Sequence, residues 1–171
     1  IIESGIKTGK TVPGLKEVIM KILFIAPASG KWRHAARSWP FNGKTFRFSM
    51  LSLLSVAAET PAGHEVRLID EQVDSIPWHE DFDLVGITFM TALAPRAYEI
   101  ADRFRERGIP VVTGGMHSTF LPEEALQHAD AVVCGQAEGI WPKVLEDAQA
   151  GSMKGIYRNE QPPDLAKMNP I

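Results

Sequence analysis

The sequence predicts an α/β domain in which helices cover both faces of a five-stranded, doubly wound parallel sheet. Between Met20 and residue 150, short apolar runs alternate with amphipathic stretches, as expected for strands joined by helices. The chain has 171 residues, 44% of them hydrophobic and 23% charged, which is typical of one globular domain. Strands that follow one another through helices pair in parallel, and this sets the expected topology.

The strands are expected where apolar residues run together. Residues 22–25 (Ile-Leu-Phe-Ile) form an unbroken apolar run, which is typical of a strand buried on both faces. Later strands are expected at 65–69, 84–89, 111–112 and 131–134. Five strands in this alternation fit the flavodoxin-like, or Rossmann-like, strand order 2-1-3-4-5.

The connections show helical signals of different strength. Pro95 suits the first turn of a helix, and apolar residues follow at helical spacing up to Gly108. Residues 70–83 show no helical pattern. The expected helices lie over 49–60, from Pro95 to Gly108, from Pro122, and from Trp141 through Leu145.

Both ends of the chain are expected to lie outside the domain of residues 20–150. Residues 1–19 lack a clear period and read as an extension or a vector remnant, with an arm packed on the domain as the alternative. Residues 151–171 contain three prolines and few apolar residues. They are expected to form a linker towards a missing C-terminal domain.

Composition excludes several classes of function. The formal net charge of −3 gives no overall basic field that would attract nucleic acid. No apolar run approaches the ~18 residues of a membrane-spanning helix, and the first 20 residues lack a secretory signal. Cys134 is the single cysteine, which excludes a disulfide framework and a cluster held by several thiolates of this chain. We therefore expect a cytoplasmic protein without nucleic-acid or membrane partners.

A ligand site is expected beyond the carboxyl ends of the strands, near the switch point between the first and third strands. Gly114 and Gly115 are informative, because residues without Cβ let the backbone approach a bulky ligand or turn with positive φ. A plain strand-to-loop turn is the alternative. The segments expected to line the site are 26–37, 88–92, 113–117 and 135–138.

Other motifs are incomplete or ambiguous. No G-x-G-x-x-G follows the first strand, and the two stretches that resemble phosphate loops, 5–11 and 38–45, both depart from the pattern. Residues 21–58 hold six Lys or Arg and no Asp or Glu, so they are a candidate for binding phosphate or an acidic partner, or else a solvated loop. His34 and His117 fall in the site loops, but a solvent-exposed or backbone-bonded histidine is the commoner case. Cys134 is expected to be a small buried hydrophobe.

Four segments of the chain follow a familiar pattern. They are MKILFIAP (20–27), PAGHEVRLIDE (61–71) and the longer stretches 86–126 and 129–147. The first two match the opening strands, and all four together resemble the cobalamin-binding domain found at the N-terminus of many radical SAM enzymes. Together these segments span nearly the whole domain.

The resemblance also carries motifs. Cobalamin domains of the methionine-synthase type have D-x-H-x-x-G after the first strand, S-x-L after the third and G-G after the fourth. Here Thr88 takes the place of the serine and would bond the buried nucleotide base, while Gly114 and Gly115 match the glycine pair that gives the nucleotide tail room. The first motif is absent around His34. This implies base-off cobalamin without an axial histidine.

By this resemblance the chain is the cobalamin-binding module of a radical SAM enzyme whose parent performs methyl transfer or oxidoreductase (cyclase) chemistry. The [4Fe–4S] cluster and S-adenosylmethionine would belong to the C-terminal radical SAM domain, because C-x-x-x-C-x-x-C is missing here. The module alone is not expected to be catalytic. The residues expected to bind cobalamin are Pro27, Ala28, Ser29, Thr88, Met90, Thr91, Gly114, Gly115, Met116, His117, Gly135, Gln136 and Glu138.

Two other functions fit parts of the sequence. A flavodoxin-like regulatory or interaction domain that has lost its ligand would explain Thr88 and the missing D-x-H-x-x-G. The N-terminal half of a sugar-nucleotide glycosyltransferase also opens with a segment like MKILFIAP, then a helix, then one like GHEVRLI.

Overall fold

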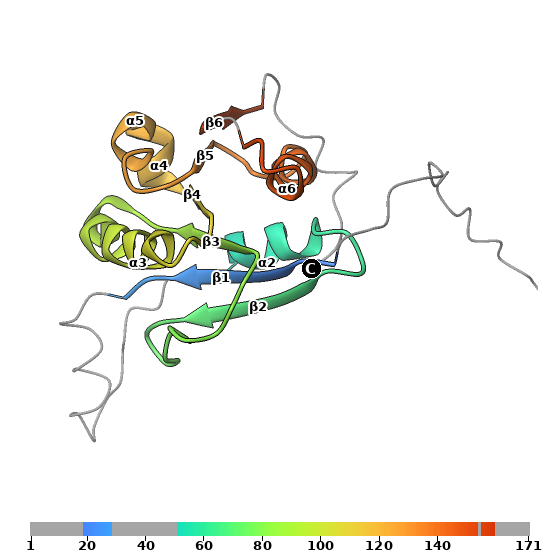
Figure 1. The fold of residues 1–171 in the computed structure, drawn as a ribbon. Coiled ribbons are helices and arrows are strands. Elements are labelled where there is room, and N and C mark those ends of the chain that lie inside the picture. The colour runs from blue at the N-terminus through green and yellow to red at the C-terminus, as the bar shows by residue number, and fades with distance from the viewer. Residues whose placement is uncertain (1–18, 29–50, 154, 160–171) are drawn as a thin grey trace, which may run out of the picture.

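A six-stranded parallel sheet forms the centre of the computed structural model, which describes residues 19–28, 51–153 and 155–159 (Figure 1). The strand order is β2-β1-β3-β4-β5-β6, and every pairing is parallel. The doubly wound α/β fold class and the order of the first five strands are therefore confirmed. The strands are β1 (Lys21–Ala26), β2 (Glu65–Asp70), β3 (Leu84–Thr88), β4 (Val111–Gly114), β5 (Ala131–Cys134) and β6 (Gly155–Arg158).

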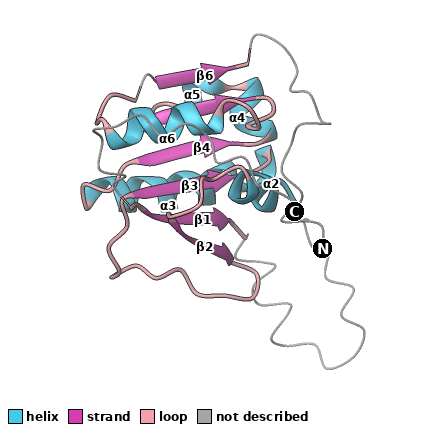
Figure 2. Ribbon diagram, turned by 90° about the vertical axis from the view of Figure 1, so that its right-hand side faces the viewer, coloured by secondary structure: helices cyan, strands magenta, loops and turns pink. Residues whose placement is uncertain are grey.

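Helices cover both faces of this sheet (Figures 1 and 2). On one face lie α2 (Leu51–Ala58) and α6 (Trp141–Gln149). On the other lie α3 (Ala94–Glu106), α4 (Met116–Phe120) and α5 (Pro122–Ala125), with the short 3₁₀ turn η1 (Thr91–Leu93) leading into α3. None of the helices in the described ranges has both the length and the apolarity needed to cross a membrane.

The central strands are buried on both faces, as their unbroken apolar runs predict. Leu23 and Ile25 of β1 face α3, whereas Ile22 and Phe24 face α2 and α6. The apolar stripe of α3 packs on the first of these faces. Its predicted members Ala97, Ile100, Ala101 and Phe104 are all 0% exposed.

The segment between β2 and β3, residues 71–83, contains no helix, as its lack of helical spacing indicates. It covers α3 through Trp78, whose ring lies 5.4 Å from that of Phe104 in a stacked arrangement. The guanidinium of Arg103 lies 4.0 Å from the centre of the Trp78 ring. An irregular segment with one large aromatic anchor thus takes the place of a helix.

The predicted number of five strands is wrong, because β6 adds a sixth strand in a region where a linker is expected. It pairs with β5 from Ala131↔Gly155 to Cys134↔Arg158. Tyr157 is buried, and its hydroxyl donates to Asp147 Oδ2 of α6 at 2.9 Å. The strand has four residues and lacks a long apolar run, so it forms by pairing with the edge of β5 rather than through its own β-propensity.

Three segments singled out from the sequence lie outside the described residues. They are the N-terminal extension, the basic and aromatic segment that includes Ser29 and His34, and the last part of the expected linker (1–18, 29–50 and 160–171).

Candidate functional site

A cavity of about 220 Å³ lies between the sheet and helices α2 and α6, at the carboxyl ends of β3 and β4. This is the edge at which ligands bind in sheets of this type. The wall opposite the sheet is apolar and includes Leu53 and Val56 of α2. Trp141 at the start of α6 completes it, with its ring centre 5.3 Å from that of Phe24 and its Nε1–H donating to Thr60 Oγ1 at 2.9 Å.

Two glycines lie on the sheet face beneath this cavity, one covered by an aromatic ring and one bare. Side chains alternate along a strand, so Gly86 of β3 and Gly114 of β4 share the face of Phe24 and Val112. A Cβ on Gly86 would lie 2.6 Å from Cδ1 of Phe24, so that ring rests directly on the backbone of β3. A Cβ on Gly114 would meet only Val133, at 3.7 Å and beyond, and the room above it belongs to the cavity.

Gly115 has a different role from Gly114. Its φ is +89°, and a Cβ there would lie 2.7 Å from Thr88 Oγ1 and 2.9 Å from Phe89 O. The loops after β3 and β4 therefore approach each other too closely for any side chain at this position. Backbone hydrogen bonds of 3.3 Å from Phe89 N–H to Gly114 O and from His117 N–H to Phe89 O join the same two loops.

The loop after β5, residues 135–138, forms the rim of the cavity. Gly135 begins it with a φ of +78°. Its N–H donates to Thr119 Oγ1 at 2.8 Å, and the Thr119 hydroxyl in turn donates to Gly115 O at 2.8 Å. One threonine of α4 thus connects the loop after β4 with the rim loop.

The structure divides the residues predicted to bind the ligand into three groups. Thr88, Gly114, Gly115, Gly135, Gln136 and Glu138 line the cavity. Ser29 lies outside the described residues. Pro27, Ala28, Met90, Thr91, Met116 and His117 are not among the lining residues. Contact of any of these residues with a ligand stays a prediction.

His117 lies on the opposite face of the sheet, because α4 turns towards α3 directly after Gly115. Its side chain is 3% exposed, with Nε2 2.8 Å from Tyr98 Oη and Nδ1 3.2 Å from Thr91 Oγ1. Tyr98 Oη donates to Glu124 Oε1 at 3.0 Å, and Nε2 of His117 lies 3.3 Å from the same carboxylate oxygen. Burial, together with the Glu124 carboxylate, raises the pKa of Tyr98. The imidazole is thus buried and bonded to side chains, not exposed or backbone-bonded as the sequence suggests.

Cys134 is buried, as predicted, with its thiol 3.7 Å from Ser118 O. Burial raises the pKa of the thiol, which keeps it protonated and unreactive at neutral pH. Within the described ranges, no group of three or more His, Cys, Asp or Glu side chains is arranged to hold a metal ion.

A buried ion pair fixes the carboxyl ends of β1 and β2. Glu71 is 2% exposed, and its Oε1 accepts from Arg96 Nη2 of α3 at 2.6 Å. Its Oε2 accepts from the backbone N–H of Ala28 at 2.9 Å. The hydrogen bond with Glu71 raises the pKa of Arg96. A glutamate that follows a strand reads as a surface residue in sequence, so this anchor has no signal there.

Sequence reasoning also missed the apolar half of the cavity. Phe24, Leu53, Val133 and Trp141 all line it and have the pattern of core residues. The alternation of side chains along a strand could have identified part of this wall. A residue two positions from Gly86 or Gly114 on the same strand shares the cavity face, and Val112 is such a residue.

Comparison with known proteins places this chain in a family. The family described as B12 binding domain matches residues 46–145, which is more than half of the chain. The solved N-terminal domain of a hypothetical protein of Thermotoga maritima covers 71% of this chain and 99% of that one, with 24% identity and a TM-score of 0.43.

Curated relatives are methyltransferases by name. The bacteriochlorophyllide d C-8(2)-methyltransferase of Chlorobaculum tepidum is 44% identical over 113 residues, covering 66% of this chain and 25% of that protein. The C-12(1)-methyltransferase of the same organism is 36% identical over 70% of this chain and 27% of that protein. An uncharacterised methyltransferase of Pyrococcus horikoshii is 30% identical over 86% of this chain and 36% of that protein.

The chain spans about a quarter of the length of the two bacteriochlorophyllide enzymes. The family match includes strands β2 to β5, helix α2 beside the cavity and helix α3 on the opposite face of the sheet. With more than half of its residues inside that match, this chain belongs to the B12-binding domain family.

Proposed function

We propose that the chain is the cobalamin-binding module of a longer radical SAM methyltransferase, and that the cavity beside α2 and α6 receives the nucleotide tail of the cofactor. The observation that carries the proposal is the bare, glycine-floored cavity at the carboxyl edge of a B12-binding domain. A cavity of about 220 Å³ suits a part of cobalamin, such as the tail with its base, and not the whole molecule.

The lining residues fit a flat, largely apolar group with a few polar atoms. Phe24, Leu53 and Trp141 offer apolar and aromatic contact, and the backbone at Gly114 offers an open floor. The Thr88 hydroxyl at the end of β3 would hydrogen-bond the base. Together these residues would bind and orient the tail and exclude water from it.

The cofactor is proposed to bind base-off, without a protein imidazole on cobalt. Among the described residues that line the cavity, none is a histidine. His117 has both ring nitrogens within hydrogen-bonding distance of Thr91 and Tyr98, on the opposite face of the sheet. These contacts support a structural role for this imidazole.

The chemistry is proposed to belong to the longer parent protein. The named relatives are methyltransferases about four times the length of the matched region. When bound, cobalamin would supply a cobalt centre able to carry a methyl group. The single cysteine means that any three-cysteine [4Fe–4S] motif, with its S-adenosylmethionine, would lie in another part of the parent.

Cobalamin retention by the purified chain tests the proposal directly. The protein is titrated with hydroxocobalamin and desalted, and the visible spectrum of the retained corrinoid is recorded. We expect about one corrinoid per chain with a base-off spectrum. Cobinamide, which lacks the nucleotide tail, is the matched control ligand and should bind more weakly.

Two results would contradict the proposal at different levels. A chain with a folded circular dichroism spectrum that retains no cobalamin would overturn binding by this module. Equal affinities for cobalamin and cobinamide would leave binding intact but remove the cavity as the site of the tail.

A further inference from the structure

Beyond the Thr119 contact at Gly135, the rim loop of the cavity, residues 135–138, is held by a side chain that follows β6. Asn159 follows β6 directly, and its Nδ2 donates to Gln136 O at 2.8 Å and to Glu138 O at 2.9 Å. An amide NH₂ has two hydrogens, so these two carbonyls use both of them. Asn159 lies beyond the family match, which ends at residue 145, and is not a lining residue of the cavity.

The loop needs such an anchor because its own sequence restrains it weakly. Gly135 and Gly139 flank it with φ values of +78° and +82°. Glycines at both ends give the backbone between them a wide choice of conformations. The N–H of Gly135 is fixed by Thr119, but Gln136 and Glu138 lie beyond that contact.

The two residues whose carbonyls Asn159 holds are themselves lining residues. Gln136 and Glu138 both border the cavity, and Ala137 between them does so too. Ala137 O also accepts from Ile140 N–H at 3.1 Å and from Trp141 N–H at 2.9 Å, which joins the loop to the start of α6. The hydrogen bonds from Asn159 to the carbonyls of Gln136 and Glu138 therefore fix the position of this part of the cavity wall.

We propose that Asn159 is a positioning residue of the site, which fixes the rim loop in the conformation that closes the cavity around the cobalamin tail. This inference rests on the proposed function. It adds to the site a residue that does not line the cavity and acts through the backbone of Gln136 and Glu138.

The test compares Asn159→Asp with the unaltered chain in two measurements. Aspartate has the same size but no N–H donors, and its carboxylate is repelled by the two carbonyl oxygens. Hydrogen–deuterium exchange without ligand should become faster in residues 135–140. The dissociation constant for hydroxocobalamin should rise by roughly tenfold, the effect expected for losing two modest hydrogen bonds.

Tyr157→Phe, on the strand that Asn159 follows, is the matched control. It removes the hydroxyl that donates to Asp147 Oδ2 and leaves the contacts of Asn159 in place. We expect its cobalamin affinity to stay within about twofold of the unaltered chain. Urea unfolding of both variants separates a general loss of stability from a change confined to the loop.

The outcomes are distinct. Faster loop exchange with weaker binding in Asn159→Asp, but not in Tyr157→Phe, is the expected result. Unchanged exchange would overturn the role of Asn159 in holding the loop. Faster exchange with unchanged affinity would overturn its role in binding. Failure of the unaltered chain to bind cobalamin would overturn the proposed function and this positioning role with it, while the exchange data would still report on the hydrogen bonds.

Discussion

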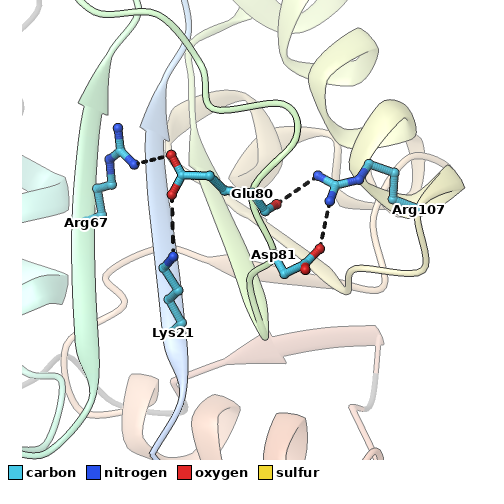
Figure 3. A network of polar contacts seen from close by, with 5 residues as sticks. All are labelled: Lys21, Arg67, Glu80, Asp81 and Arg107. Carbon is cyan, nitrogen blue, oxygen red and sulfur yellow. Dashed lines mark hydrogen bonds and ion pairs between the residues drawn. The ribbon is translucent and has the colours of Figure 1, made fainter.

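The two edges of the sheet are built in opposite ways. At the amino edge, charged side chains from separate elements form one network (Figure 3). Glu80 accepts from Arg67 Nη1 at 2.8 Å and from Lys21 Nζ at 3.4 Å. Arg107, just after α3, donates to Asp81 Oδ1 at 2.9 Å and to the backbone carbonyl of Glu80 at 2.9 Å. This network joins β1, β2, the irregular segment before β3 and the end of α3.

At the carboxyl edge, beside β4 and β5, bare backbone takes the place of such a network. Gly114, Gly115 and Gly135 stand at the ends of β4 and β5, beside the cavity. Exposed ion pairs are worth little each, so the amino edge gains modest stability from many contacts. The comparison shows that this charged network and the backbone that a ligand can approach lie at opposite ends of the sheet, the network beside β1, β2 and β3 and the open backbone beside β4 and β5.

Filling the bare floor of the cavity should have the largest effect. In Gly114→Leu the new side chain would project into the cavity, and we expect cobalamin affinity to fall by about a hundredfold with the fold retained. The backbone there is not in the left-handed region, and a Cβ makes only ordinary contacts with Val133. Gly114→Ala is the control and should bind with an intermediate affinity in the same titration. Full affinity in Gly114→Leu would show that the ligand lies elsewhere.

The second effect breaks the buried Glu71–Arg96 ion pair at the carboxyl edge. Arg96→Met removes the cation beside the buried Glu71 carboxylate, and we expect the free energy of unfolding to fall by roughly 3 kcal/mol. Urea unfolding followed by tryptophan fluorescence measures it. Glu99→Gln removes the other partner of Arg96, which is 68% exposed, and should cost less than about 0.5 kcal/mol. Equal effects from the two variants would refute the distinction between buried and exposed pairs.

The third effect tests whether the two faces of β4 have different roles, one in ligand binding and the other in stability. Thr113 pairs in register with Ile87 and Val132, so its side chain points away from α2 and α6, and its buried hydroxyl has no hydrogen-bond partner within the described structure. Thr113→Val replaces this hydroxyl with a methyl group of similar size. We expect the free energy of unfolding to rise by about 1 kcal/mol with cobalamin affinity unchanged. A clear loss of affinity would mean that the hydroxyl faces the ligand.

The smallest expected effect is at the amino edge and is a change in how the free energy of unfolding depends on pH. The hydrogen bond from Arg67, with a further contribution from Lys21, holds the pKa of Glu80 below its ordinary value of 4.5. A lowered pKa in the folded state means that the stabilisation is complete above the unfolded pKa and is lost as pH falls through the folded one. Glu80→Gln should therefore flatten the decline of unfolding free energy between about pH 5 and pH 3. If the unfolding free energies of the unaltered chain and Glu80→Gln depend on pH in the same way, Glu80 does not contribute to stability through this network.

The fold was largely predictable because its signals are local. Pro95 and the apolar spacing after it determine α3, and the unbroken run at 22–25 requires a strand covered on both faces. β6 was not predictable in this way. Ile156 and Tyr157 are its only large apolar residues. The strand forms because it pairs with β5, from which α6 separates it in the chain, and no local sequence pattern indicates that pairing.

The candidate site was predictable at its backbone and not at its walls. Thr88, Gly114 and the loop after β5 can be placed at the carboxyl edge from topology alone. Leu53 and Trp141 cannot, because an apolar residue that faces a cavity and one that faces a neighbour have the same pattern in sequence. The Asn159 contacts join residues more than twenty positions apart through two side-chain donors, for which no sequence signal exists.

The sixth strand also sets a practical boundary for the domain. A shortened version that stops at Gly151 would turn β5 into an edge strand, with the unpaired N–H and C=O groups that β6 now satisfies. Exposed edges of this kind invite pairing between molecules, so such a fragment should self-associate. It would also lose Asn159 and, with it, the outer support of the rim loop. A fragment intended for cobalamin binding therefore has to extend past residue 159.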